Sequence, residues 1–383
     1  MDPQIWDIHE ANEKIPKLKY ALDMKRTFAL SILIAAVMPL STSAQKIGPS
    51  DIKFNDIQVI GSHNSYKIAI EQPLMDFLVA RDSAGGRSLE YEHIPMREQL
   101  VLGLRNLELD VYHDPKGGHF SGPSGLDIVR ASGNTPLAFD LEGKLELPGL
   151  KVFHVQDIDF RSHQLLFKDA LLELLEWSER NPEHTPIIIT LNAKDGKIPE
   201  LRQPFEFDAD ALENLDTEIK NVIPESKLIV PDLVRGNEAT LEGAILKNGW
   251  PLLDSLRGRF LFVLDEGRAK TDLYLQKFPN LKGAALFVNR EAGNPEAAFL
   301  IVNDPVRSFD RIKSLVEKGY MVRTRADSGT KEARENDYSK FEKAKASGAQ
   351  VITTDYYVPS RLFKSSFKVV FDGGQYERIK HQK

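Results

Sequence analysis

Short apolar runs recur along this chain, and they constrain its fold more than any other feature. Each run is five to eight residues long and rich in Val, Ile, Leu and Phe. The runs cover residues 57–61, 104–111, 151–155, 187–191, 259–265, 284–289, 320–325 and 350–355. Most are apolar almost throughout, which is typical of strands buried on both faces of a parallel sheet. The sequence therefore predicts eight parallel strands.

Amphipathic segments lie between several of these runs. The clearest covers residues 162–180, where apolar side chains recur at helical spacing until an Asn-Pro pair ends the pattern. Further helices are predicted at residues 209–223, 307–319 and 339–348, whereas residues 114–149 are rich in Gly and Pro and predict a long irregular loop. Strands that alternate with helices predict an α/β protein with a single (β/α)8 barrel, in which the second helix is irregular or missing.

The composition excludes several functional classes. The 383-residue chain has a formal net charge of -6 and no long basic stretch, which argues against nucleic acid as the main partner. It contains no cysteine, so it has no disulfide, no thiolate metal site and no cysteine nucleophile. No pattern in the sequence identifies a protein partner.

The N-terminal segment has the pattern of a secretory signal peptide. Two basic residues after Met24 precede an apolar run over residues 28–40, and small residues follow the run. We place the predicted cleavage between Ala44 and Gln45. The run is too short to span a bilayer comfortably, although a buried or membrane-anchoring helix is the alternative.

This cleavage divides the chain into a signal peptide, residues 1–44, and a barrel domain, residues 45–383. Residues 1–23 are polar and precede the signal, so we interpret Met24 as the true start and residues 1–23 as a start-site extension. We therefore expect an exported protein, either secreted or periplasmic.

Polar side chains follow nearly every predicted strand. In a (β/α)8 barrel the carboxyl ends of the strands form the face that carries the active site. Glu108 and Asp110 are two residues apart, so a strand points both to the same side. The other polar side chains at these ends are His63, Asn64, His154, Asn192, Lys194, Asp265, Asn289, Arg323, Arg325, Asp327, Asp355, Tyr356 and Tyr357. We expect these groups to surround one site.

Four of these side chains offer hard oxygen ligands. They are Asn64, Glu108, Asp110 and Asn192. Ligand sets made only of oxygen suit Ca²⁺ or Mg²⁺ rather than zinc. The sequence therefore predicts a hard-cation site.

The remaining groups suit phosphate chemistry. His63 and His154 can act as general acid, as general base or as hydrogen-bond donors to a phosphate. Lys194 and Arg325 can hold an anion, the latter through its guanidinium fork. Two imidazoles beside a hard cation and basic side chains predict chemistry on a phosphodiester.

Each of these residues also has a structural interpretation. A histidine at a strand end is more often structural, and residues 63–65 could form only an Asx turn. The two carboxylates of residues 104–111 could be salt-bridge partners of Arg323 or Arg325, and the tyrosines 356–357 could only pack. The histidines that we interpret as structural or solvent-exposed are His93, His113, His119 and His163.

Several motifs, taken in order, resemble a known family. GSHNSY, LELDVYHD, FHVQDID and PIIITLNAKD resemble the catalytic half-barrel of phosphoinositide-specific phospholipases C. RTRADSGTKEAREND and SGAQVITTDYY resemble the C-terminal motif of the secreted bacterial calcium-dependent branch. The resemblance covers about residues 51–360, and the motifs in order are far more specific than any one alone.

The resemblance implies a TIM-like barrel, one Ca²⁺, and cleavage of phosphatidylinositol at a membrane surface into diacylglycerol and an inositol phosphate. By motif position, His63 and His154 match the two catalytic histidines. The calcium ligands matched in the same way are Asn64, Glu108 and Asp110. The family usually has Glu where this chain has Asn192, so we expect weaker calcium binding.

The implied mechanism is internal attack by the inositol hydroxyl next to the phosphate, which first forms a cyclic inositol phosphate. One histidine protonates the leaving oxygen, and the other acts as base or stabilises the pentacovalent phosphorus. The resemblance also suggests inositol-ring contacts by Arg325, Asp327 and Tyr357, besides an anion contact by Lys194.

Two other functions compete with this interpretation. A glycerophosphodiester phosphodiesterase would use the same barrel, but those enzymes usually begin with His-Arg-Gly, whereas this chain has Ser-His-Asn-Ser. A secreted inositol-phosphate-binding protein with a weakened site is the second alternative, and only Asn192 supports it.

Overall fold

The computed structural model describes residues 51–380, so the predicted signal peptide and its cleavage site lie outside the described residues. None of the helices within residues 51–380 is long and apolar enough to cross a bilayer.

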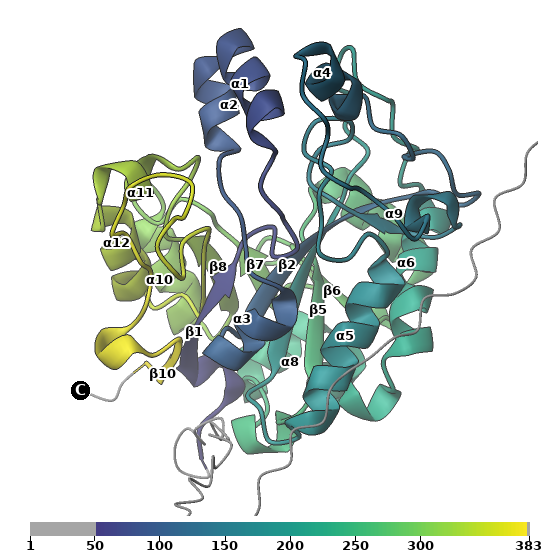
Figure 1. Cartoon of the computed structure of the whole chain (residues 1–383). Coiled ribbons are helices and arrows are strands. Elements are labelled where there is room, and N and C mark those ends of the chain that lie inside the picture. Colours follow the sequence, from purple (N-terminus) through teal and green to yellow (C-terminus); the bar gives the residue numbers. More distant parts are fainter. Residues whose placement is uncertain (1–50, 381–383) are drawn as a thin grey trace, which may run out of the picture. The chain divides into compact units, whose positions relative to one another are not determined.

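Eight parallel strands form a nearly closed barrel (Figure 1). They are β1 (Ile57–Ser62), β2 (Asn106–Tyr112), β4 (Ile187–Ala193), β5 (Phe260–Leu264), β6 (Leu286–Val288), β7 (Phe299–Ile301), β8 (Met321–Arg325) and β9 (Val351–Thr354). Their order in the sheet is β6-β5-β4-β2-β1-β9-β8-β7. A single parallel bridge between Asn289 and Phe299 joins the two outermost strands. The predicted TIM-like α/β barrel is therefore confirmed.

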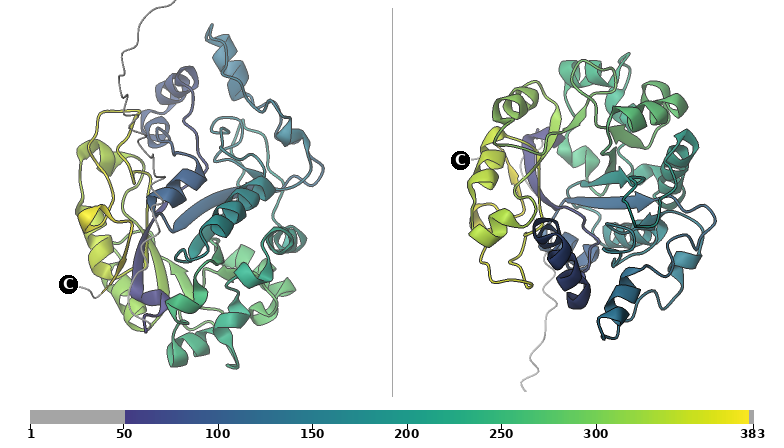
Figure 2. Two further views of the ribbon diagram at one scale, coloured as in Figure 1. Left: turned by 60° about the horizontal axis from the view of Figure 1, so that its bottom comes forward. Right: turned by 90° about the horizontal axis from the view of Figure 1, so that it is seen from above.

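The strands are buried because side chains fill the barrel and helices cover it outside. Every residue of β1, β2 and β5 is buried. Seen from above, helices surround the strands (Figure 2). This double burial explains why the strand sequences are apolar almost throughout.

One predicted strand position is wrong and one barrel strand was not predicted, although the number of barrel strands is right. The run at residues 151–155 forms only β3 (Lys151–Val152), which pairs antiparallel with the end of β2. The chain then reverses through a bridge between Val155 and Asp159, so this run cannot join the barrel. The missing barrel strand is β7, which is three residues long and follows β6 without a helix in residues 289–298. Because no helix separates β6 from β7, the alternation of strands and helices in the sequence did not reveal β7 as a separate strand.

The predicted helices are present, with shorter ends. They are α5 (Phe167–Arg180), α6 (Ala209–Val222), α10 (Phe309–Glu317) and α12 (Ser339–Ser347). The Asp208 carboxylate accepts a hydrogen bond from the backbone of Ala211 and so begins α6, and Gly348 ends α12 with a φ of 80°. The structure adds α3 (Met96–Leu102), α7 (Pro231–Arg235), α8 (Leu241–Asn248), α9 (Arg268–Lys277) and α11 (Lys331–Glu335).

Several segments extend beyond the carboxyl ends of the strands. Helices α1 (Gln72–Arg81) and α2 (Ser83–Ser88) follow β1, and both project from the barrel beside α4 (Gly125–Ala131), which follows β2 (Figure 1). Apart from α4 and one short 3-10 turn, residues 114–149 are irregular, as predicted. At the amino end of β1, β10 (Glu377–Ile379) pairs antiparallel with it.

Candidate active site

The turn after β1 presents His63 and Asn64. Asn64 has a φ of 50°, in the left-handed region that asparagine tolerates better than most residues. The backbone N–H of Ser65 donates to the carbonyl of Glu108 at 2.9 Å, and the Ser65 hydroxyl accepts from the Glu108 N–H at 2.8 Å. The turn is therefore tied to β2 and its position is fixed.

His63 is held by a carboxylate and a guanidinium. Its Nδ1 lies 2.9 Å from Asp355, and Arg325 lies 3.3 Å from its Nε2. Burial, and then the charge of Arg325, lower the pKa of His63 well below its ordinary value, so the imidazole is neutral. The Nδ1–H donates to Asp355, which leaves the lone pair on Nε2.

His154 has the same arrangement. Its Nδ1 lies 2.7 Å from one oxygen of Asp159, and the buried ammonium of Lys67 lies 2.7 Å from the other. Burial alone would raise the pKa of Asp159, but Lys67 and the hydrogen bond from His154 outweigh burial and lower it. Asp159 is therefore a carboxylate that accepts the Nδ1–H and leaves Nε2 as the free ring nitrogen.

Both imidazoles lie against one tyrosine. The ring centroid of Tyr91 is 6.1 Å from that of His63 and 6.4 Å from that of His154. The structure therefore brings together the two histidines that the sequence singled out, although they lie on different segments.

The predicted oxygen ligands also converge. Glu108 and Asp110 are buried, and Asp110 lies in register with Asn192 on the neighbouring strand. The Nδ2 of Asn192 donates to Glu108 at 3.2 Å, and the Nε2 of His63 lies 3.6 Å from the same carboxylate oxygen. The Glu108 carboxylate therefore links the Asn192 amide to the first histidine.

Asn64 supplies the observation that tests whether a hard cation fits. Its Nδ2 donates to the Tyr91 hydroxyl at 2.7 Å, and its side chain is buried. Its Oδ1 has no hydrogen-bond partner among the described residues. A buried amide oxygen without a partner is costly, and coordination to a cation would satisfy it. The oxygen-only donors and this unsatisfied atom both fit Ca²⁺.

Basic side chains also contact the two carboxylates. Arg323, which is buried, binds Glu108, and Lys194 lies 3.2 Å from Asp110. The alternative interpretation, in which these carboxylates form salt bridges with arginines, is correct for Glu108, which binds Arg323. Arg325 pairs with Asp355 instead. Within residues 51–380, no cluster of three or more His, Asp or Glu side chains has the geometry to hold a metal. The proposed ligand set is not such a cluster, because only Glu108 and Asp110 are carboxylates and its other two members are asparagines.

Arg323 also joins strand β8 to the ends of other segments. Its guanidinium donates to Asn303 at 2.8 Å and to Asp265 at 3.4 Å. Burial raises the pKa of Asp265 to about 7, although the charge of Arg323 opposes that rise. The sequence had placed Asp265 and Arg323 at strand ends but had not paired them.

Two predicted ring contacts are buried under the site. The Asp327 carboxylate accepts from the Thr354 hydroxyl and, at 3.1 Å, from the Asp355 N–H. The Tyr357 hydroxyl accepts from the Ile94 N–H at 3.2 Å, and its ring stacks on His93. Both side chains are buried, and their contact with an inositol ring stays a prediction. Lys194 and Arg325, by contrast, are 34% and 15% exposed.

Sequence reasoning placed Asp355 at a strand end without pairing it with His63, and it missed the other residues that support the site. Asp159 lies five residues after His154 in the quoted motif FHVQDID, so a carboxylate near that histidine was a usable signal. Lys67 and Tyr91 have no comparable signal, because their roles come from contacts. His93 is structural, as expected: its Nε2 donates to the His63 carbonyl at 2.7 Å, and burial lowers its pKa to about 4.

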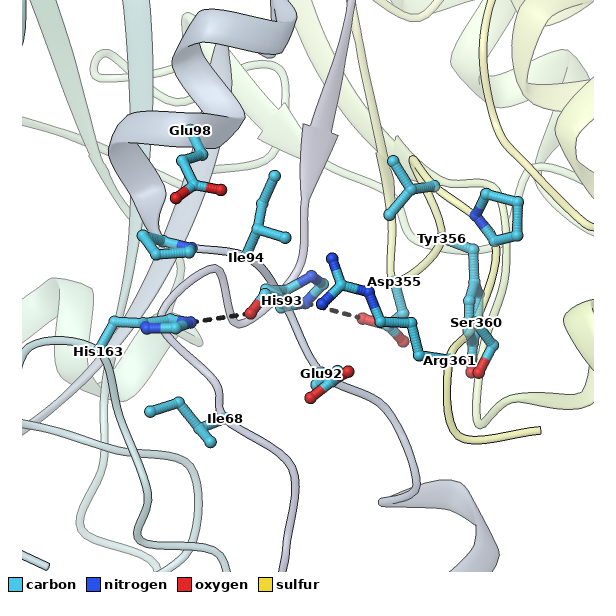
Figure 3. A pocket seen from close by; sticks show the side chains of 13 residues that line it. Ile68, Glu92, His93, Ile94, Glu98, His163, Asp355, Tyr356, Ser360 and Arg361 are labelled. Carbon is cyan, nitrogen blue, oxygen red and sulfur yellow. Dashed lines mark hydrogen bonds and ion pairs between the residues drawn. The ribbon is translucent and has the colours of Figure 1, made fainter.

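A pocket of about 360 Å³ lies beside Asp355, the carboxylate that binds Nδ1 of His63 (Figure 3). Its wall includes His93 and Asp355, which lie side by side, and His163, whose Nε2 donates to the His93 carbonyl at 2.8 Å. None of the four oxygen donors lines it. The pocket therefore lies next to the site but is not the proposed metal position.

Comparison with known families decides the identity. A family model described as phosphoinositide phospholipase C, Ca²⁺-dependent, matches residues 52–380. The chain belongs to this family. It is therefore a phosphodiesterase of the phosphoinositide phospholipase C type, and calcium dependence is a property of its family. The resemblance inferred from the motifs is confirmed.

Solved structures agree on the fold. A calcium-dependent phosphoinositol-specific phospholipase C from Pseudomonas sp., in a myoinositol complex, is 16% identical with a TM-score of 0.52, and the match covers 87% of this chain and 98% of that one. A calcium-dependent phosphatidylinositol-specific phospholipase C from Streptomyces antibioticus is 17% identical with a TM-score of 0.51, over 83% and 99% of the two chains. No curated protein sequence matches the chain.

Proposed function

We propose that this phospholipase cleaves phosphatidylinositol into diacylglycerol and a cyclic inositol phosphate, with Ca²⁺ held by Asn64, Glu108, Asp110 and Asn192. The observation that carries the proposal is the paired geometry of the histidines. Each Nδ1 is bound to a buried carboxylate, so Nε2 is the ring nitrogen left for proton transfer, and that of His63 lies 3.6 Å from the proposed ligand Glu108.

The proposed chemistry divides between a cation and the side chains. Calcium held by Asn64, Glu108, Asp110 and Asn192 would supply positive charge near the phosphate and would lower the pKa of the attacking hydroxyl. One imidazole accepts the proton of the attacking inositol hydroxyl at its Nε2, and the other, which enters the reaction with a proton on both ring nitrogens, delivers its Nε2 proton to the leaving glycerol oxygen. Asp355 and Asp159 accept the Nδ1–H of the two imidazoles, so both proton transfers occur at Nε2.

Basic side chains serve the phosphate in this proposal. Arg325 is partly exposed and contacts His63, so it can bind a phosphate oxygen beside the acid–base group. Lys194 is partly exposed and pairs with Asp110. In the proposed complex each exchanges part of its ion pair for the substrate phosphate.

A membrane surface is the proposed location of the substrate. Segments that follow the carboxyl ends of the strands carry exposed apolar side chains, including Phe77 in α1, Leu137 and Phe205. An ion pair between Arg81 and Glu200 joins α1 to the segment after β4. Exposed apolar groups on this face would contact lipid while the headgroup enters the site.

Release of diacylglycerol from vesicles tests the proposal. Turnover of phosphatidylinositol vesicles with calcium, its loss in EGTA, and little turnover of phosphatidylcholine vesicles are expected. Glycerophosphoinositol, which lacks acyl chains, is the comparison substrate, and preferential turnover of it would favour the glycerophosphodiesterase function instead. Calcium-dependent binding of inositol phosphate without any turnover would favour the binding protein.

A further inference from the structure

Tyr91 lies at the centre of the site, yet neither the motifs nor the proposed chemistry gives it a role. It is buried, and its ring lies 5.7 Å from that of His93. The ammonium of Lys67 lies 4.9 Å from its ring centroid, a cation–π contact. These contacts fix the position of the hydroxyl.

The Tyr91 hydroxyl bonds the side chain of Asn64, which has no other side-chain hydrogen bond among the described residues. It accepts from the Nδ2 of Asn64 at 2.7 Å, and the Oδ1 at the other end of that carboxamide has no partner among the described residues. The two ends of a carboxamide are nearly the same size and differ only in whether they donate or accept. If the carboxamide turned over, it would present an NH₂ group to the cation in place of an oxygen.

We propose that Tyr91 is a positioning residue, which holds the Asn64 carboxamide with its oxygen directed to the calcium site. The inference rests on the calcium site of the proposed function. The hydrogen bond satisfies the buried NH₂ group in the orientation that frees Oδ1, and it makes that oxygen a better ligand. Without the hydroxyl, the side chain must leave the NH₂ group unpaired or turn away.

The backbone restrains the same side chain from the other end. The left-handed conformation of Asn64 and the two bonds between Ser65 and Glu108 hold its Cα. The remaining freedom of Asn64 is rotation about its side-chain bonds, and this is the freedom that the hydroxyl removes. The backbone therefore places the amide, and the hydrogen bond to Tyr91 holds its side chain with the NH₂ end on the hydroxyl and the oxygen end toward the calcium site.

Calcium titration of Tyr91→Phe by isothermal calorimetry tests this role. We expect the dissociation constant to rise about tenfold to a hundredfold, the usual cost of losing a group that orients a metal ligand. Tyr320→Phe is the matched control, because Tyr320 is also buried and its hydroxyl bonds a side chain, Glu242, before β8 begins. Its calcium affinity should equal that of the wild type.

Asn64→Asp separates positioning from packing. A carboxylate has two equivalent oxygens, so no orientation remains to be selected. Removing the Tyr91 hydroxyl in this background should change calcium affinity by less than about threefold, against at least about tenfold in the wild type. Tyr91→Met, which also lacks the hydroxyl, should weaken calcium binding as Phe does, and near-UV circular dichroism confirms folding.

Three outcomes overturn the inference. In the first, Tyr91→Phe or Tyr91→Met binds calcium within about twofold of the wild type. In the second, the loss is equally large in the Asn64→Asp background, which means that Tyr91 acts by packing. In the third, the wild type does not bind calcium at millimolar concentration, which overturns the proposed metal site and this inference with it.

Discussion

The Nδ1 atom of His154 lies 2.7 Å from a carboxylate oxygen of Asp159. Lys67 binds the other oxygen of that carboxylate, so Asp159 stays charged and accepts the Nδ1–H of His154, which leaves Nε2 for the substrate. The same relation holds between His63 and Asp355, with Arg325 in the place of the lysine. Each imidazole is thus oriented through its Nδ1 by a carboxylate that itself pairs with a basic side chain.

Replacing Asp159 with Asn should remove this orientation while keeping the shape. An amide can present its NH₂ group to Nδ1, which favours the wrong tautomer, so we expect turnover to fall by about two to four orders of magnitude. Calcium affinity should be unchanged, since no proposed ligand contacts Asp159. Asp127→Asn, at an exposed ion pair with Arg130, is the control. Turnover within threefold of the wild type would contradict the role of Asp159.

The two histidines should each be essential for turnover and dispensable for the metal. His63→Ala and His154→Ala should each cost at least about two orders of magnitude in turnover, the size of a lost general acid or base. Calcium binding by calorimetry should survive in both variants. Circular dichroism must accompany the kinetics, and an active variant of either histidine would refute its assignment.

Asn192→Glu should tighten calcium binding about tenfold to a hundredfold, because affinity follows the number of charged ligands. In the structure the Asn192 amide donates to Glu108, so a glutamate there places two carboxylates together. Without calcium the variant should therefore unfold at a lower temperature than the wild type, and calcium should raise that temperature more.

Asn192→Ala is the opposite test at the same position. It should weaken calcium binding but leave some activity at high calcium concentration. Calorimetry and thermal unfolding with and without EGTA measure both effects. Equal affinities in all three proteins would show that residue 192 does not face the metal.

Lys67→Met should destabilise the fold in a pH-dependent way. Breaking this buried pair should cost about 3–5 kcal/mol at neutral pH. Lys67 holds the pKa of Asp159 below its ordinary value, so the stability from this carboxylate is present above the unfolded pKa and is lost as pH falls through the folded one. The difference between variant and wild type should therefore stay constant from pH 7 to about pH 4 and shrink as the pH falls below that value. Urea unfolding from pH 7 to about pH 3 measures it, and a difference that stays constant over the whole range would contradict the assignment.

The export signal remains a prediction, because it lies outside the described residues. N-terminal sequencing of exported protein should show a mature start at or near Gln45. A mature start at Met1 or Met24 would contradict the predicted cleavage.

The sequence by itself was enough to predict the barrel and the polar groups on its active face. Strand periodicity is a local property, and the carboxyl ends of parallel strands always share one face, so Glu108, Asp110 and Asn192 could be placed together without coordinates. The motifs added the family. The local signals failed where the run at residues 151–155 turned back as a hairpin and where β7 followed β6 without a helix.

Only the tertiary structure decided which residues support the chemistry. His63 meets Asp355 across 292 residues of chain, Glu108 meets Arg323 across 215, and Lys67 meets Asp159 across 92. No local pattern encodes such pairs, because they depend on which strands become neighbours and on the depth of each side chain. The orientation of Asn64 has the same origin: its identity is in the sequence, but the Tyr91 hydroxyl that bonds its amide reaches it only through the fold.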